Sequence, residues 1–358
     1  MKKTHSIVFK SVRKQYPPSG STQRYLSDGT VAVSNVSLRV RKGEVFGLLG
    51  ENGAGKSTLL NILMRQLCPS QGKIFVNEKD IQKTLFDKND VGFCPQANAL
   101  FDNLTVRETL RFYARVRGVS NSEIEDFVTS WIESSRLERF EHTKSNQLSG
   151  GNKRKLSLTI SMLGLPALAI LDEPSAGVDP ASRVRLHRLI KAARKLGTTT
   201  VLTTHQMTDA ETMSDRISIM VKGRLRCLGT PHHLLSKYSK AIVCSIKMRR
   251  DYDVDDEVIP MLKSLVPSAK IMSKPSPEYV VLSLSTTDDR KFRMSKIYKE
   301  LERYRDEKRK IEFFSIGQAS LETVFVSLSS ESNNKNDDDD EEENSKISEN
   351  TGTELYVV

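Results

Sequence analysis

The stretch Gly50-Glu51-Asn52-Gly53-Ala54-Gly55-Lys56-Ser57-Thr58 decides how the rest of the chain is interpreted. It matches the pattern G-x-x-x-x-G-K-[ST], in which glycines let the backbone curl and point successive N–H groups at phosphate oxygens. The run Glu44 to Leu49 before it predicts a strand, and the spacing of apolar residues from Leu59 to Leu67 predicts a helix after it. This is the strand–turn–helix setting in which the pattern binds phosphates. We therefore expect Lys56 to reach the β- and γ-phosphates of a nucleotide and the Ser57 hydroxyl to ligate Mg²⁺.

A second buried strand, Ala167 to Leu171, is followed directly by the acidic pair Asp172 and Glu173. Ligands of open α/β sheets bind outside the carboxyl ends of the strands, so both carboxylates are expected beside the phosphate loop. Asp172 is suited to hold Mg²⁺, usually through water. Glu173 is suited to polarise the attacking water as a general base.

Short apolar runs alternate with helical periodicity through the first two thirds of the chain, which predicts an α/β core with a largely parallel sheet. The exception is the stretch 104–163, where three segments in succession show helical spacing, so we expect a helical insertion there. Before the phosphate loop, Ile7 to Phe9 and Val36 to Val40 read as strands, with a polar loop around Pro17 between them.

Further motifs carry a resemblance to a known family. Leu148-Ser149-Gly150-Gly151-Asn152 resembles the signature of ATP-binding cassette (ABC) ATPases, Gly92 to Gln96 their Q-loop, Ser175 to Pro180 their D-loop, and Thr204-His205 their switch histidine. All stand in family order within residues 5 to about 238. The stretches from Cys94 to Thr105, from Leu148 to Ser157 and from Arg224 to Gly229 further resemble subfamily A of these transporters. The signature and the segment Arg226 to Gly229 are more similar to its second nucleotide-binding domain than to its first.

The resemblance implies a P-loop NTPase core over residues 1–238, with an N-terminal antiparallel β subdomain, a helical subdomain at about 97–163, and ATP and Mg²⁺ as cofactors. It implies that the signature serves in trans, completing the pocket of a second nucleotide-binding domain in a head-to-tail dimer, and that His205 contacts the γ-phosphate. Tyr16 is expected to stack on adenine, with Tyr25 as the rival. The expected catalytic residues are Lys56, Glu173 and His205, the metal ligands Ser57, Gln96 and Asp172, and the nucleotide-binding residues Tyr16, Gly50, Glu51, Asn52, Gly53, Ala54, Gly55, Lys56, Ser57, Thr58 and Gln96, with Ser149, Gly150 and Gly151 acting in trans.

The C-terminal third is expected to form a separate unit. Residues 239–330 show the order β-α-β-β-α-β of a small ferredoxin-like α+β domain and resemble the regulatory domain of subfamily A. Residues 331–358 hold ten acids and two bases, a net charge of −8, whereas the whole chain is +10, so residues 1–330 carry +18. Repulsion within the acidic run Asp337 to Glu343 predicts a disordered tail.

Composition limits the remaining function classes. A hydrophobic content of 37% and a charged content of 28% fit a folded globular chain, and no apolar run approaches the roughly 18 residues that cross a bilayer. Scattered cysteines fit a reduced cytosolic compartment, so we expect a cytoplasmic protein. The resemblance implies that it lies at the cytosolic face of a membrane. The resemblance implies transmembrane partner domains and lipid translocation. The alternative is a non-transport ATPase of the same superfamily acting on nucleic acid or ribosomes, which the basic body leaves open. No aromatic-rich basic motif supports it, so no nucleic-acid partner is expected.

Overall fold

The computed structural model describes residues 5–17, 29–84, 90–238, 241–250, 252–267, 269–285, 294–306, 309–318, 320–322 and 324–325. Tyr25 and the acidic tail, both subjects of predictions, lie outside these residues. The chain divides into two compact units, Met1–Pro231 and His232–Val358, which are described separately.

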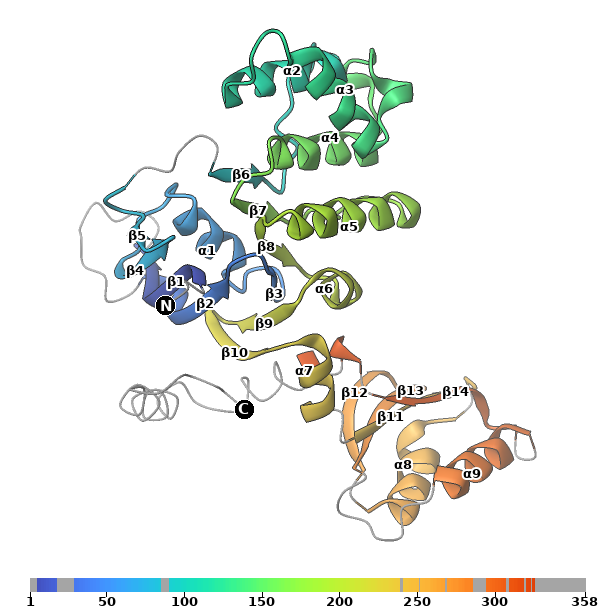
Figure 1. The fold of residues 1–358 in the computed structure, drawn as a ribbon. Coiled ribbons are helices and arrows are strands. Elements are labelled where there is room, and N and C mark those ends of the chain that lie inside the picture. Colours follow the sequence, from blue (N-terminus) through green and yellow to red (C-terminus); the bar gives the residue numbers. More distant parts are fainter. Residues whose placement is uncertain are drawn as a thin grey trace. The chain divides into compact units, whose positions relative to one another are not determined.

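A six-stranded sheet forms the centre of the first unit. Figure 1 shows where its strands lie. Its strand order is β10-β9-β3-β8-β7-β6, and every pairing except the β9–β10 hairpin is parallel. The predicted parallel α/β core is therefore confirmed. Parallel strands covered on both faces are buried along their length, and the apolar runs Val45–Leu49 and 168–171 made this sheet visible in the sequence. The strands are β3 (Val45–Leu49), β6 (Val91–Cys94), β7 (Leu168–Asp172), β8 (Thr199–Thr204), β9 (Arg216–Val221) and β10 (Arg224–Gly229).

Helices cover both faces of this sheet. Successive residues of β7 point to opposite sides: Ile170 belongs to the core cluster that contains the buried face of α1, whereas Leu171 belongs to the cluster with residues of α4 and α5. Because the phosphate loop joins β3 to α1 while the acidic pair follows β7, both reach the same carboxyl edge of the sheet. The covering helices are α1 (Lys56–Leu63), α4 (Gly150–Met162), α5 (Pro180–Lys195) and α6 (Met207–Met213).

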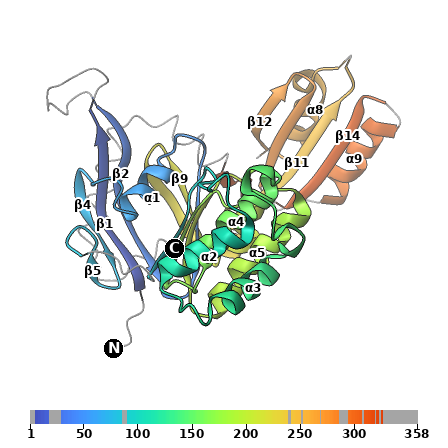
Figure 2. The same ribbon diagram turned by 90° about the horizontal axis from the view of Figure 1, so that it is seen from above.

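A second, antiparallel sheet has the order β2-β1-β4-β5 and confirms the predicted N-terminal β subdomain. In Figure 2, α1 lies between this sheet and the central one, and the apolar residues of both sheets share a core with Leu60 and Leu63. The predicted strand Ile7 to Phe9 is much longer than expected, because its antiparallel pairing with β2 continues through several register shifts to Tyr16. The strands are β1 (His5–Tyr16), β2 (Thr30–Arg41), β4 (Gln71–Val76) and β5 (Lys79–Asp80).

The helical insertion contains α2 (Val106–Arg117) and α3 (Ile124–Ser135), which share an apolar cluster with Leu156 and Ile160 of α4. Thr105 and Glu108 form a capping box that starts α2, and Gly118 ends it in the left-handed conformation. α3 ends at Ser135, because Arg136 adopts a left-handed conformation with φ of 53°. Two 3₁₀ turns, Glu138–Phe140 and Ser145–Gln147, lead back to α4.

The second unit packs two helices on one face of a four-stranded antiparallel sheet of order β12-β13-β11-β14. Its elements follow the predicted β-α-β-β-α-β order, and its assignment to the ferredoxin-like folds stays a prediction. α7 precedes this unit's sheet. The elements are α7 (Pro231–Tyr238), β11 (Ala241–Met248), α8 (Val254–Leu265), β12 (Lys270–Ser276), β13 (Tyr279–Ser285), α9 (Met294–Asp306) and β14 (Ile311–Gln318).

Candidate active site

The phosphate loop is pressed against backbone on two sides. Gly55 caps α1 with φ of 102°, and a Cβ there would lie 2.1 Å from the Ala32 carbonyl oxygen. A Cβ on Gly50 would lie 2.5 Å from the Met220 carbonyl oxygen, and the Gly223 N–H donates to the Ala54 carbonyl at 2.9 Å. The glycines are thus required for conformation at Gly55 and for close approach at both positions.

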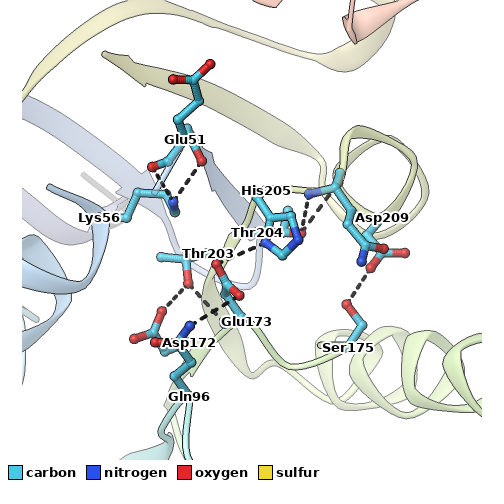
Figure 3. A network of polar contacts seen from close by, with 12 residues as sticks. Glu51, Lys56, Gln96, Asp172, Glu173, Ser175, Thr203, Thr204, His205 and Asp209 are labelled. Atoms are coloured by element: carbon cyan, nitrogen blue, oxygen red, sulfur yellow. Dashed lines mark hydrogen bonds and ion pairs between the residues drawn. The ribbon is translucent and has the colours of Figure 1, made fainter. Parts of the chain in front are cut away.

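The Lys56 side chain is buried and folds back over its own loop. Its ammonium donates to the Gly50 carbonyl at 2.7 Å and to the Glu51 carbonyl at 3.0 Å, as Figure 3 shows. An ammonium has three N–H donors, so one remains for a phosphate. Burial lowers the pKa of Lys56, while the charges of Glu173 and Asp172 act in the opposite direction.

Asp172 and Glu173 are both buried and both attached to Thr203 on the neighbouring strand β8. The Thr203 hydroxyl donates to Asp172 Oδ1 at 2.5 Å and accepts the Glu173 N–H at 3.0 Å. The parallel register places Asp172 beside Thr203, so one hydroxyl fixes both acidic residues. Glu173 itself has φ of 49°, an uncommon left-handed conformation for glutamate that turns the chain out of β7.

The Glu173 carboxylate lies between two predicted site residues, as Figure 3 shows. His205 Nδ1, just after β8, is 3.1 Å from Oε1, and Gln96 Nε2, just after β6, is 3.5 Å from Oε2. Three strands thus bring a carboxylate, an imidazole and an amide together at one edge. A carboxylate held by a neighbouring imidazole and amide is suited to orient and deprotonate a water molecule.

The oxygen donors beside the loop are those that magnesium prefers. Ser57 stands in the first turn of α1, and Asp172 keeps one carboxylate oxygen outside its bond with Thr203. Among the described residues, no group of three His, Cys, Asp or Glu side chains is arranged to hold a metal. One carboxylate and one hydroxyl suit Mg²⁺, which takes its other ligands from water and substrate phosphates, and do not suit a zinc site.

The predicted signature lies at the N-terminus of α4, on the surface. Ser149 caps the helix by accepting the Asn152 N–H at 3.3 Å, and Ser149 and Gly150 are exposed. No described hydrogen bond or ion pair joins Ser149, Gly150 or Gly151 to the phosphate loop of the same chain. The structure therefore brings Lys56, Gln96, Asp172, Glu173 and His205 into one site and leaves the signature outside it.

Tyr16 is the last residue of β1, where it is half-buried and pairs with Thr30. The Lys14 ammonium lies 5.4 Å from the centre of its ring. The choice between Tyr16 and Tyr25 as the adenine-stacking residue stays a prediction, because Tyr25 lies outside the described residues.

Sequence reasoning missed a buried network behind His205. Asp209 on α6 is 1% exposed, accepts a hydrogen bond from the Ser175 hydroxyl, and has His187 Nε2 at 3.3 Å and Arg183 Nη1 at 3.8 Å. Burial raises the pKa of Asp209, but these partners outweigh it and leave the pKa below the ordinary value. An acidic residue four positions after His205, on an apolar helix face, was the available signal.

Thr203 and Arg154 were also missed. The strand β8 has the sequence TTVLTT and is buried along its whole length. Buried hydroxyls need hydrogen-bond partners, so the two threonines at its carboxyl end, just before His205, were the available signal. Arg154 on α4 is 2% exposed and bonds to the main chain of the site. Arg154 lies between Lys153 and Lys155 in the sequence, so nothing in the sequence distinguished it as the buried one.

The sequence of this chain is similar to that of known proteins. Residues 33–176 match the family model described as ABC transporter. The chain is 36% identical over 330 residues to mouse ATP-binding cassette sub-family A member 9 and 34% identical over 329 residues to the rat cholesterol transporter ABCA5, in each case over 91% of its own length. It spans only a fifth of the length of these relatives.

A solved structure shares the fold of the first unit. It is the dimeric post-hydrolysis state of the ATP-binding cassette MJ0796 bound to ADP and Pi, with a TM-score of 0.56 and 24% identity over 63% of this chain and 98% of that one. None of the helices in the described part of this chain is both long enough and apolar enough to cross a bilayer.

Proposed function

Because this chain carries the ATPase domain of the ABC transporter family, we propose that it binds and hydrolyses ATP to drive transport through transmembrane partner domains. The observation that carries the proposal is the Glu173 carboxylate, held by His205 and Gln96 at the sheet edge that also presents Lys56. Both relatives named above belong to subfamily A, in accord with the resemblance.

The residues divide the work of hydrolysis by their charges. Lys56 neutralises the β- and γ-phosphates, and backbone N–H groups of Gly50 to Thr58 hold their oxygens. Glu173 takes the proton of the attacking water, and His205 holds that water and the γ-phosphate in line. Ser57, Gln96 and Asp172 would hold Mg²⁺, which neutralises charge on the phosphates. Tyr16 stacks on the adenine.

We further propose that the signature acts in trans. The exposed N-terminus of the 13-residue helix α4 offers N–H groups and a positive dipole end to an anion, yet its own phosphate loop does not use it. A second nucleotide-binding domain in head-to-tail arrangement would place its γ-phosphate there. The solved cassette with this fold is dimeric, which supports such an arrangement.

The transport partner is expected to meet the helical subdomain. Phe101 and Phe112 are 47% and 44% exposed and stack edge-to-face at 5.4 Å, with Val116 one turn further along α2. An exposed apolar group of this kind beside the Gln96 loop suits a docked helix from a transmembrane domain. We propose that residues 1–238 lie at the cytosolic face of a membrane and that residues 239–330 form a regulatory domain. The rat relative's name motivates a lipid cargo.

The proposal is tested with Glu173→Gln, compared with Glu133→Gln on the exposed surface of α3. Glu173→Gln is expected to keep ATP affinity, to lower hydrolysis about 10²–10⁴-fold because the general base is lost, and to form dimers in Mg-ATP by light scattering. Glu133→Gln is expected to match the wild type, and Lys56→Ala to lose nucleotide binding. A Glu173→Gln chain that stays monomeric in saturating Mg-ATP contradicts the dimer, and one that still hydrolyses ATP contradicts the base.

A further inference from the structure

Arg154 heads the set of largest fully buried side chains, at 2% exposure, and lies five residues after Ser149 on α4. It has no described carboxylate partner. Its guanidinium instead donates to backbone carbonyls of the two catalytic loops, namely Pro95 at 2.5 Å, Gln96 at 3.1 Å, Asp172 at 2.5 Å, Glu173 at 2.7 Å and Pro174 at 3.0 Å.

The two sides of the guanidinium hold different strands. Nη1 bonds the segment after β6, where Asn98 Oδ1 adds a contact at 3.4 Å, whereas Nη2 and Nε bond the segment after β7. Only arginine offers five donors in a rigid planar fork, and lysine, with a compact ammonium, cannot span both segments. The fork therefore sets the distance between the main chains of Gln96 and Glu173, whose side chains meet at 3.5 Å.

The same turn of α4 is also attached to the helical subdomain. Lys155, the next residue, is buried and donates to the Arg136 carbonyl at the end of α3, at 3.2 Å. Near the other end of α4, a Cβ on Gly92 of β6 would lie 1.8 Å from the Ser161 carbonyl oxygen, so helix and strand are in direct backbone contact. A displacement of α4 is therefore transmitted to the loop that carries Gln96.

We propose that Arg154 is the positioning residue that aligns Gln96 with Glu173. Because Arg154 is on α4, this alignment changes when the signature end of that helix moves. The inference rests on the proposed function, in which Ser149 to Gly151 contact a partner's ATP. Arg154 does not touch substrate. When the signature of this chain contacts a partner's ATP, the distance between Gln96 and Glu173 at this chain's own ATP would change. Hydrolysis at one site would thereby depend on binding at the other.

The test compares Arg154→Lys with Lys191→Met, which removes an exposed cation from α5. Arg154→Lys is expected to bind ATP within about threefold of wild type and to lose at least about 30-fold in kcat, with KM little changed. In the Glu173→Gln background the same substitution is expected to change residual hydrolysis by less than about twofold and to leave ATP-driven dimers intact, because Arg154 acts through Glu173. Lys191→Met is expected to match wild type in both backgrounds.

Unchanged kcat in Arg154→Lys, or equal losses in both backgrounds, overturns the proposal. If the wild type neither hydrolyses ATP nor dimerises, the proposed function has failed instead. Should Arg154→Lys not fold, NMR of the Arg154 guanidinium in Glu173→Gln protein decides, since its signal is expected to shift when Mg-ATP closes the dimer. A signal that stays in place on closure overturns the coupling.

Discussion

Replacing Thr203 by valine tests how the acidic pair is held. Valine keeps the shape of threonine but removes the hydroxyl that donates to Asp172 and accepts from the Glu173 N–H. Losing a hydrogen bond to a carboxylate costs about 1.5–3 kcal/mol, and a buried unpaired N–H costs about 1–3 kcal/mol. Relaxation recovers part of this, so we expect the free energy of unfolding to fall by about 3 kcal/mol. For a unit of this size, the melting temperature should drop by roughly 6–12 °C.

The matched control is Thr200→Val on the same strand. Thr200 is equally buried, but its hydroxyl has no described hydrogen-bond partner, so its loss should be neutral or stabilising. Urea unfolding measures the stability of both variants. ATP turnover is expected to fall about tenfold or more in Thr203→Val alone, because the Glu173 N–H loses its hydrogen bond to the Thr203 hydroxyl. Equal stability of the two variants, or normal turnover in Thr203→Val, would refute the reasoning.

Two further predictions concern pH. Burial lowers the pKa of Lys56 below its ordinary 10.5, so the ammonium loses its charge at a lower pH and ATP affinity should decline as pH rises through the lowered value. Isothermal titration calorimetry from pH 7 to 10 measures this decline. An affinity that stays constant over this range would contradict the prediction. Asp209→Asn should lower the free energy of unfolding by about 3 kcal/mol at pH 7 by leaving His187 and Arg183 without a carboxylate. Since the pKa of Asp209 is depressed, its stabilisation is present above pH of about 4 and is lost as pH falls through the depressed value. Urea titrations at pH 3–7 should therefore show the difference shrinking in acid, and a constant difference would contradict the ion-pair role.

Motifs whose chemistry is local could be predicted from the sequence. The phosphate loop needs its glycines, Lys56 and Ser57 at fixed spacing, and the strands before Gly50 and Asp172 are nearly continuous apolar runs, so both were visible without coordinates. The carboxyl edge rule then placed Asp172 and Glu173 near the loop, where the structure shows them.

What could not be predicted depends on contacts between distant segments. Arg154 and Lys155 are adjacent in sequence, yet one bonds the catalytic loops and the other bonds α3, and helical spacing gives no measure of such partners. The length of β1 depends on pairing with a strand about 25 residues away, so Ile7 to Phe9 was only its most apolar part.

At Glu173 the left-handed backbone conformation favours a different residue type from the one that the proposed chemistry requires. Glycine adopts this conformation without steric cost, so selection for a more robust fold alone would replace the glutamate there. In the proposed function, the role of Glu173 in activating water is the reason to keep a glutamate there. In a copy of this domain that no longer had to hydrolyse ATP, Glu173 would be expected to be among the first residues substituted, and the substitution would increase the stability of the fold.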